Sequence, residues 1–192
     1  NNFHLVDRAL AGRKSQGITT AVYENVSFWT FANPGLDANS LSEDPQFANP
    51  SIRDYHLKTI AVSGRYDAVN RVWTNDAVYS RLIDAGDPTS AYDNEPAPNG
   101  GRINVGLHGN SWEASKSPAG KMLTVLTLKQ GGAVGDSVDL RWTSRDVQWV
   151  RIEYSLDGGA TWSVWQEYID ASLGSNKWIT ASLPPTVLGM WR

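Results

Sequence analysis

The sequence predicts an all-β protein, and three observations support this fold class. Hydrophobic residues make up 41% and charged residues 19% of the chain, which are proportions of a globular protein. The 17 glycines and 9 prolines favour strands and turns over helices. Apolar and polar residues alternate in the second half, where Val138, Leu140 and Trp142 are separated by Asp139 and Arg141.

The composition changes near Pro118, and this change predicts two segments. A chain of 192 residues is long enough for one domain with a sizeable core or for two small ones. Turn-rich sequence before this point gives way to regularly alternating strands after it. We therefore expect one unit at 1–117 and a second at 118–192, joined at Ser117–Gly120.

Charge and composition exclude several classes of protein. A net charge of −3 without a cluster of Lys and Arg argues against binding to DNA or RNA. The absence of cysteine excludes disulfides, thiolate catalysis and cysteine-ligated zinc. No apolar run has the length of a membrane-spanning helix. The chain starts at Asn1 without a methionine and stops at Arg192 within a predicted strand, so we expect a fragment of a longer protein.

The first segment contains several short candidate strands. One is expected within 1–10, and the run 18–35, rich in β-branched and aromatic residues, predicts one or two more. Residues 63–76 carry Tyr66 and Trp73 on either side of a polar turn, a pattern typical of a hairpin.

Two prolines bracket an aromatic residue in the middle of the first segment. Pro45 and Pro50 favour extended backbone at Asp44 and Asn49, the residues that precede them. Phe47, between them, is then expected to point inward and to cover the end of a core.

Two stretches of the first segment resemble a known family. The run NSLSEDPQFANP, at 39–50, is followed by Asp54-Tyr55-His56-Leu57, and the stretch 82–117 contains IDAGDP, NEPAPNGGRIN, a G-x-x-G and EASKS. Both resemble the last coils and closing segment of secreted bacterial right-handed parallel β-helix proteins of the pectate-lyase-like group. The resemblance implies terminal β-helix rungs at 1–117, a secreted or cell-surface location, and polysaccharide or a cell-surface glycan as partner. Family lyases act through groups on central rungs, which would lie before Asn1.

The closing segment holds four carboxylates in a turn-rich loop. Asp84, Asp87 and Asp93 are candidate calcium ligands, although their spacing is not that of an EF-hand. The alternative is that Asp84 and Asp87 cap turns through backbone amides. Asp84, Asp87, Glu95 and Arg102 are also the candidates for a catalytic carboxylate and arginine site, while Arg102 alternatively pins the loop by pairing with an acid. No other cofactor is expected.

The three histidines are predicted to have structural roles, because their spacing is not that of a zinc site. His4, His56 and His108 stand far apart in the sequence, without the H-x-H or H-E-x-x-H spacing of zinc sites. The chain also lacks the G-x-S-x-G turn that carries the nucleophile of many hydrolases.

The second segment predicts five strands. They fall within 121–132, 135–144, 147–162, 163–172 and 176–184. Short strands separated by turns describe a β-sandwich, and their order resembles immunoglobulin-like or fibronectin type III-like modules. Such sandwiches have about seven strands, so we expect an incomplete one whose open sheet edges allow self-association.

One hairpin of the second segment carries a turn motif. Residues 155–162, SLDGGATW, match the pattern S-x-D-x-G-x-T-W and resemble an Asp-box. Asp157 is expected to accept hydrogen bonds from turn amides, Gly159 to allow positive φ, and Trp162 to pack back on the hairpin. The motif predicts a stable turn and says little about function, because it recurs in unrelated β modules.

Tryptophan is concentrated in the second segment, which holds six of the nine: Trp142, Trp149, Trp162, Trp165, Trp178 and Trp191. Trp142 is in phase with Val138 and Leu140 and is expected in the core. Trp149 and Trp165 are the candidates for an exposed sugar-binding pair, and burial in the core is the alternative for both.

The sequence leaves three hypotheses for function. The first is a non-catalytic fragment of a secreted polysaccharide-active or surface-attached β-helix protein, with a carbohydrate-binding or spacer role. The second is a polysaccharide lyase or glycoside hydrolase that uses the carboxylates and arginine named above. The third is a structural assembly unit that pairs through open sheet edges.

Overall fold

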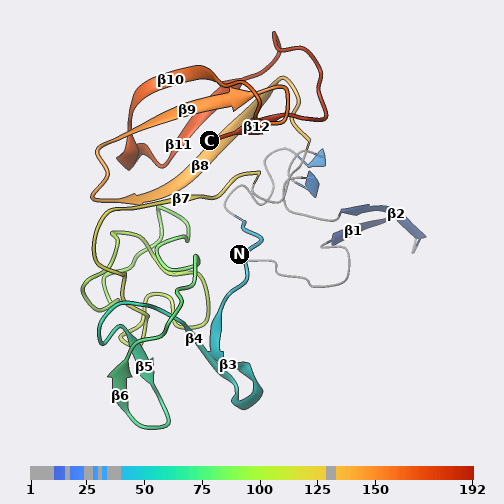
Figure 1. Cartoon of the computed structure of the whole chain (residues 1–192). Coiled ribbons are helices and arrows are strands. Elements are labelled where there is room, and N and C mark those ends of the chain that lie inside the picture. Colours follow the sequence, from blue (N-terminus) through green and yellow to red (C-terminus); the bar gives the residue numbers. More distant parts are fainter. Residues whose placement is uncertain (1–10, 16–17, 24–27, 30–31, 34–39, 129–132) are drawn as a thin grey trace. The chain divides into compact units, whose positions relative to one another are not determined.

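The computed structural model describes residues 11–15, 18–23, 28–29, 32–33, 40–128 and 133–192 (Figure 1). The chain divides into two compact units, unit 1 at Asn1–Gly120 and unit 2 at Lys121–Arg192. This boundary lies at the end of the joint that the sequence indicates. The strand expected within 1–10 lies outside the described residues, as do His4 and parts of the run 18–35. None of the described helices has the length and apolar character needed to cross a membrane.

The described residues of unit 1 include three small antiparallel pairs of strands and a short 3-10 helix. The strands are β1 (Ala11–Ser15), β2 (Ile18–Tyr23), β3 (Phe47–Asn49), β4 (Asp54–Leu57), β5 (Arg65–Asp67) and β6 (Val72–Thr74), and η1 (Pro50–Ile52) joins β3 to β4. The pairs are β1 with β2, β3 with β4, and β5 with β6. The two strands of each pair are consecutive in the chain and antiparallel, so each pair is local in sequence.

The hairpin predicted at 63–76 is confirmed. Its two strands, β5 and β6, place Tyr66 opposite Trp73, and the ring centroids are 5.6 Å apart. Phe47, expected to point inward, lies in β3 and is partly buried, with its ring 5.3 Å from that of Tyr55 in an edge-to-face arrangement. These contacts follow from local sequence, because cross-strand neighbours in a hairpin are fixed by its turn.

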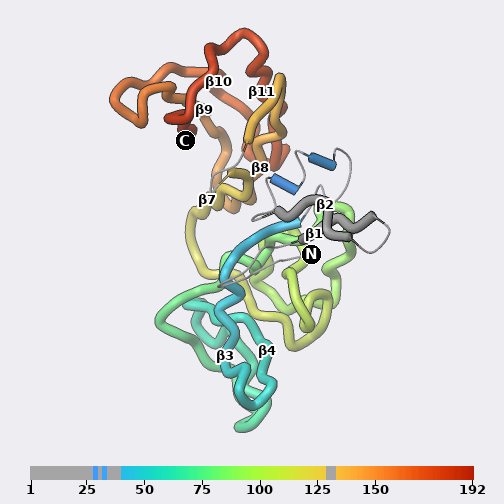
Figure 2. The backbone as a smooth tube through the Cα atoms, turned by 90° about the vertical axis from the view of Figure 1, so that its right-hand side faces the viewer, coloured from blue at the N-terminus to red at the C-terminus, as the bar shows by residue number. Residues whose placement is uncertain are grey.

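Residues 75–120 fold without a regular strand, as a series of turns coloured green to yellow in Figure 2. Many backbone groups there bond to side chains, since no ladder of strands is present to satisfy them. Buried polar residues are correspondingly frequent: Ser80, Asp84, Glu95, Asn104, Ser115 and Ser117. Leu82, Ile83 and Ala114 are buried among them.

Where the structure describes it, unit 2 forms two three-stranded antiparallel sheets, drawn in yellow to red in Figure 1. One has the order β10-β9-β12 and the other β11-β8-β7. The strands are β7 (Met122–Val125), β8 (Ser137–Arg145), β9 (Trp149–Ser155), β10 (Ser163–Asp170), β11 (Ser175–Ile179) and β12 (Met190–Trp191), and η2 (Ala171–Leu173) joins β10 to β11. The five predicted strands are present, and β12 is a short sixth.

The core of unit 2 is formed by the alternating residues of these strands. Leu140 and Trp142 of β8, Val150 and Ile152 of β9, Ile169 of β10, Ala171 and Trp178 form one buried cluster. Trp142 is 3% exposed, as its phase with Leu140 predicts, and its indole N–H donates to the carbonyl of Ala171 at 2.8 Å. The described chain is therefore all-β, built from small antiparallel sheets with few helical residues.

Candidate functional site

Unit 1 brings β4 next to a segment almost sixty residues further along the chain. The hydroxyl of Ser115 donates to the carbonyl of Leu57 at 2.5 Å, and the hydroxyl of Thr59 donates to the carbonyl of Lys116 at 2.9 Å. The amide of Lys116 also donates to the carbonyl of Gly64. These bonds place His56 of β4 close to Glu113.

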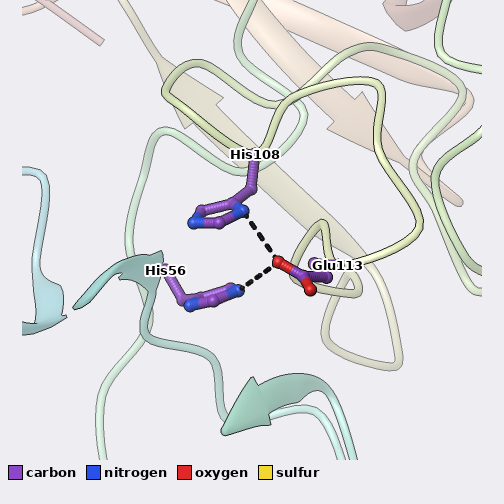
Figure 3. A group of neighbouring side chains, drawn as sticks. All are labelled: His56, His108 and Glu113. Atoms are coloured by element: carbon purple, nitrogen blue, oxygen red, sulfur yellow. Dashed lines mark ion pairs between the residues drawn. The ribbon is translucent and has the colours of Figure 1, made fainter. Parts of the chain in front are cut away.

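His56, His108 and Glu113 form what we call the imidazole–carboxylate cluster (Figure 3). Glu113 Oε2 lies 3.4 Å from His56 Nε2 and 3.3 Å from His108 Nδ1. The three ligand atoms all lie within 4.8 Å of one another. The two imidazole rings are stacked, with centroids 3.7 Å apart and an interplanar angle of 12°. One carboxylate oxygen thus faces a nitrogen of each ring.

A second carboxylate holds His56 from its other side. Asp54 lies two residues earlier in β4, on the same face of the strand, and its Oδ1 is 2.6 Å from His56 Nδ1. Arg65 lies behind Asp54, with Nη1 3.9 Å from Asp54 Oδ2. The same guanidinium makes two bonds to Asp76, of 2.9 and 3.1 Å, and this hydrogen bonding raises the pKa of Arg65. Asp54 and the His56 ring are therefore held in a fixed orientation.

The loop that carries His108 is held by Glu95. Glu95 Oε1 accepts the amide of Asn104 at 2.8 Å and that of Asn110 at 2.9 Å, one on each side of His108. Burial raises the pKa of the Glu95 carboxyl, against the opposing effect of these two bonds. The Asn104 side chain continues the network, because its Nδ2 donates to the carbonyl of Ser115 at 2.7 Å.

Burial and the neighbouring ring of His56 lower the pKa of His108, while Glu113 acts in the opposite direction. The neutral imidazole of His108 is thus favoured, so one of its nitrogens carries a lone pair. Which nitrogen that is depends on the tautomer. Because His108 is 22% and Glu113 27% exposed, solvent reaches this side of the cluster.

An aromatic cluster of Tyr66, Trp73 and Trp112 lies beside these imidazoles. The Tyr66 ring packs edge-on against Trp112 at 4.9 Å and against His56 at 6.1 Å. Lys116 Nζ lies 4.3 Å from the centroid of the Trp73 ring, a cation–π contact. Trp112 is 59% exposed, so most of a large apolar ring faces solvent while its neighbour Tyr66 supports it.

Several of the residues predicted to be catalytic or to bind calcium make hydrogen bonds to backbone groups and hydroxyls of nearby turns. Asp84 is 3% exposed, and its carboxylate accepts the amide of Gly100 at 2.9 Å and the hydroxyl of Ser117 at 2.6 Å. Asp87 caps a turn by accepting the amide and hydroxyl of Thr89, as the turn-capping alternative predicts. The Nε of Arg102 donates to the carbonyl of Gly86.

Asp84, Asp87 and Asp93 do not gather into a metal-binding group in the described part of the chain. The one group there with three ligand atoms within 4.8 Å is the imidazole–carboxylate cluster. Asp84 and Glu95 instead bond to backbone amides of the loops around it, so these buried acids support the cluster.

The predicted turn of unit 2 has the expected hydrogen bonds. Asp157 accepts from the amide of Thr161 at 2.9 Å, and from the hydroxyls of Thr161 and Ser155 at 2.7 Å each. These bonds lower the pKa of Asp157 to about 2. Gly159 has a φ of 89°, and its carbonyl accepts the indole N–H of Trp162 at 3.0 Å. The three residues therefore act in the local fold of the hairpin.

The predicted sugar-binding pair of unit 2 does not lie on one face. Trp149 is 51% exposed and alternates in β9 with the buried Val150 and Ile152. Trp165 packs against the core, with its ring 6.2 Å from that of Trp178. Successive residues of a strand point to opposite faces, so the two rings do not form a common platform.

Sequence reasoning missed the imidazole–carboxylate cluster. His56 and His108 were expected to be separate structural residues, and Glu113 was not singled out. A local signal did exist, because Asp54 and His56 share one face of a predicted strand. The approach of His108 and Glu113 to that face depends on long-range hydrogen bonds that no spacing rule contains. Comparisons of the chain with protein-family models, curated proteins and solved structures find no match.

Proposed function

We propose that the chain is a non-catalytic part of a secreted, polysaccharide-active or surface-attached β-helix protein, and that unit 1 binds glycan through Trp112. The observation that carries this proposal is the exposed Trp112 ring supported by Tyr66. The CH groups of a sugar ring pack on the face of an indole, and a supported ring loses little conformational freedom on binding. The resemblance of 39–57 and 82–117 to closing β-helix coils supplies the expected class of partner.

The proposal includes a fold for each unit and a location outside the cell. Residues 1–117 would form the last rungs and cap of a right-handed parallel β-helix. Unit 2 would be an immunoglobulin-like or fibronectin type III-like module that spaces the binding unit from its surroundings. Both would lie outside the cell, and the open sheet edges of unit 2 would provide the contacts for any self-association.

The enzyme alternative draws less support from the geometry. A catalytic pair of carboxylates must face a groove in which substrate lies. Asp84 and Glu95 are 3% and 5% exposed, and both accept backbone amides. These two acids are positioned as parts of the fold.

Affinity electrophoresis tests the proposal, with polygalacturonate and a neutral glucan in separate gels. We expect the wild-type chain to be retarded by at least one polymer and Trp112→Ala to weaken that binding about tenfold, which corresponds to about 1.4 kcal/mol. Trp149→Ala is the matched control, since it removes from unit 2 an indole that is exposed to 51%, against 59% for Trp112.

Each outcome of this experiment is informative. Equal retardation of wild type and Trp112→Ala would contradict a role for unit 1, and loss with Trp149→Ala alone would move the site to unit 2. Absence of retardation by any tested polymer would contradict glycan binding. Appearance of an unsaturated uronate product, detected by its absorbance, would contradict the non-catalytic assignment.

A further inference from the structure

The Nε2 atom of His56 is buried without a hydrogen-bond partner. His56 is 3% exposed, and with a proton on Nδ1 its ring donates to Asp54 Oδ1 at 2.6 Å. In the neutral ring Nε2 then carries a lone pair, and this buried nitrogen has no hydrogen-bond partner. Its nearest charged neighbour is Glu113 Oε2, which is also rich in electrons. Two such atoms face each other stably only when a cation or a proton lies between them.

The distances between the ligand atoms indicate whether a cation or a proton lies between them. The 3.4 and 3.3 Å separations from Glu113 Oε2 to the two imidazole nitrogens are longer than the usual 2.7–3.2 Å of N–H···O bonds. A metal ion about 2.1 Å from each of two tetrahedral ligands separates those ligand atoms by about 3.4 Å. The two measured separations therefore match edges of a coordination tetrahedron better than hydrogen bonds.

We propose that His56 Nε2, His108 Nδ1 and Glu113 Oε2 bind one divalent transition metal ion, of the class of Zn²⁺. Two imidazoles and one carboxylate are the donor set of zinc sites that keep a fourth position open. Calcium is a poorer candidate because it takes six to eight oxygen ligands. This inference stands on the cluster alone and does not rest on glycan binding.

The residues around the cluster support a metal role. Asp54 bonds to the nitrogen of His56 that faces away from the site, which fixes the tautomer and the orientation of the ring. The backbone amide of His56 also donates to Asp54 Oδ1 at 3.1 Å, and the charge of Arg65 lies 3.9 Å from Asp54 Oδ2. The partial exposure of His108 and Glu113 gives a path for the ion to enter.

Binding also requires a definite movement. A metal ion lies close to the plane of each imidazole that binds it, and the rings are now stacked 12° from parallel. We therefore expect the ring of His108, which lies in a loop, to turn away from that of His56 when metal binds. Metal binding would therefore end the stacking of the two rings.

The experiment is a titration of the metal-free chain with Zn²⁺, followed by calorimetry, and with Co²⁺, followed by visible absorbance. We expect one ion per chain and, for Co²⁺, the intense visible bands of a tetrahedral site. The ligand variants Glu113→Gln and His108→Ala should each bind about 100-fold more weakly or worse, and Asp54→Asn about 10- to 100-fold more weakly. Asp93→Asn is the matched control, because it removes the same charge from an exposed loop position in unit 1.

Nuclear magnetic resonance of the imidazole nitrogens provides a readout that does not depend on affinity. In the metal-free chain we expect a proton on His56 Nδ1 and none on Nε2, and on adding Zn²⁺ the resonances of His56 Nε2 and His108 Nδ1 should shift. A proton on Nε2 without uptake of Zn²⁺ would overturn the proposal and assign the cluster to an ordinary ion pair. Unchanged binding in the doubly substituted Glu113→Gln, His108→Ala chain would also overturn it, whereas a folded Glu113→Gln variant that loses the ion would support it.

Discussion

Replacing Asp84 by Asn should destabilise unit 1 whether or not calcium is present. Asp84 Oδ1 accepts the amide of Gly100 and Oδ2 the hydroxyl of Ser117, so an amide side chain keeps an acceptor for one of these donors. A hydrogen bond to a charged group contributes about 1.5–3 kcal/mol, and a buried donor without an acceptor costs about 1–3 kcal/mol. We expect a loss of about 3 kcal/mol, or about 10 °C in Tm for a unit of this size.

The assay is amide hydrogen exchange of unit 1 peptides in increasing urea, in calcium and in a calcium chelator. The control is Asp87→Asn, because Asp87 lies in an exposed turn and caps it through the amide and hydroxyl of the neighbouring Thr89, so that we expect a loss of about 1 kcal/mol or less. Equal stability of Asp84→Asn and wild type would refute the structural role. A loss seen in calcium and absent in chelator would show that Asp84 is a calcium ligand, which is one of the two roles that the sequence predicts for it.

Two further predictions concern unit 2. Acidification from pH 4 towards pH 2 should destabilise it, because the pKa of Asp157 is lowered to about 2 and its stabilising charge is complete only above the unfolded value near 3.8; urea midpoints of wild type should fall over this range, and those of Asp157→Asn should change less. Ile152→Ala should cost about 2–5 kcal/mol, since Ile152 is 2% exposed in the core, while the control Ile179→Ala, at a position 46% exposed, should cost about 1 kcal/mol or less. Tryptophan fluorescence during urea unfolding measures both, and equal midpoints for the two isoleucine variants would contradict the described core.

The sequence predicts much of unit 2 because its information is local. The alternation of Leu140 and Trp142 with charged residues selects the buried face of β8, and the same rule selects Val150 and Ile152 in β9. The turn at Asp157 follows from side chains within seven residues of one another. The sequence leaves Trp165 open between an exposed and a core position, because its partner, Trp178, comes from a strand of the other sheet.

Unit 1 depends on polar contacts between distant segments, and these determine where its chemistry lies. Asp84 bonds to Asn104 and Ser117, Asn104 bonds to Glu95 and Ser115, and Ser115 bonds to Leu57, next to His56. The dense group of acids in this sequence suggests a catalytic or metal-binding site, yet two of them, Asp84 and Glu95, instead accept backbone amides and hold loops in place. Burial of a carboxylate is costly unless backbone amides satisfy it, so such an acid fixes the loop that supplies them. This hydrogen-bond network brings distant segments of unit 1 together, and the imidazole–carboxylate cluster of His56, His108 and Glu113 lies where they meet.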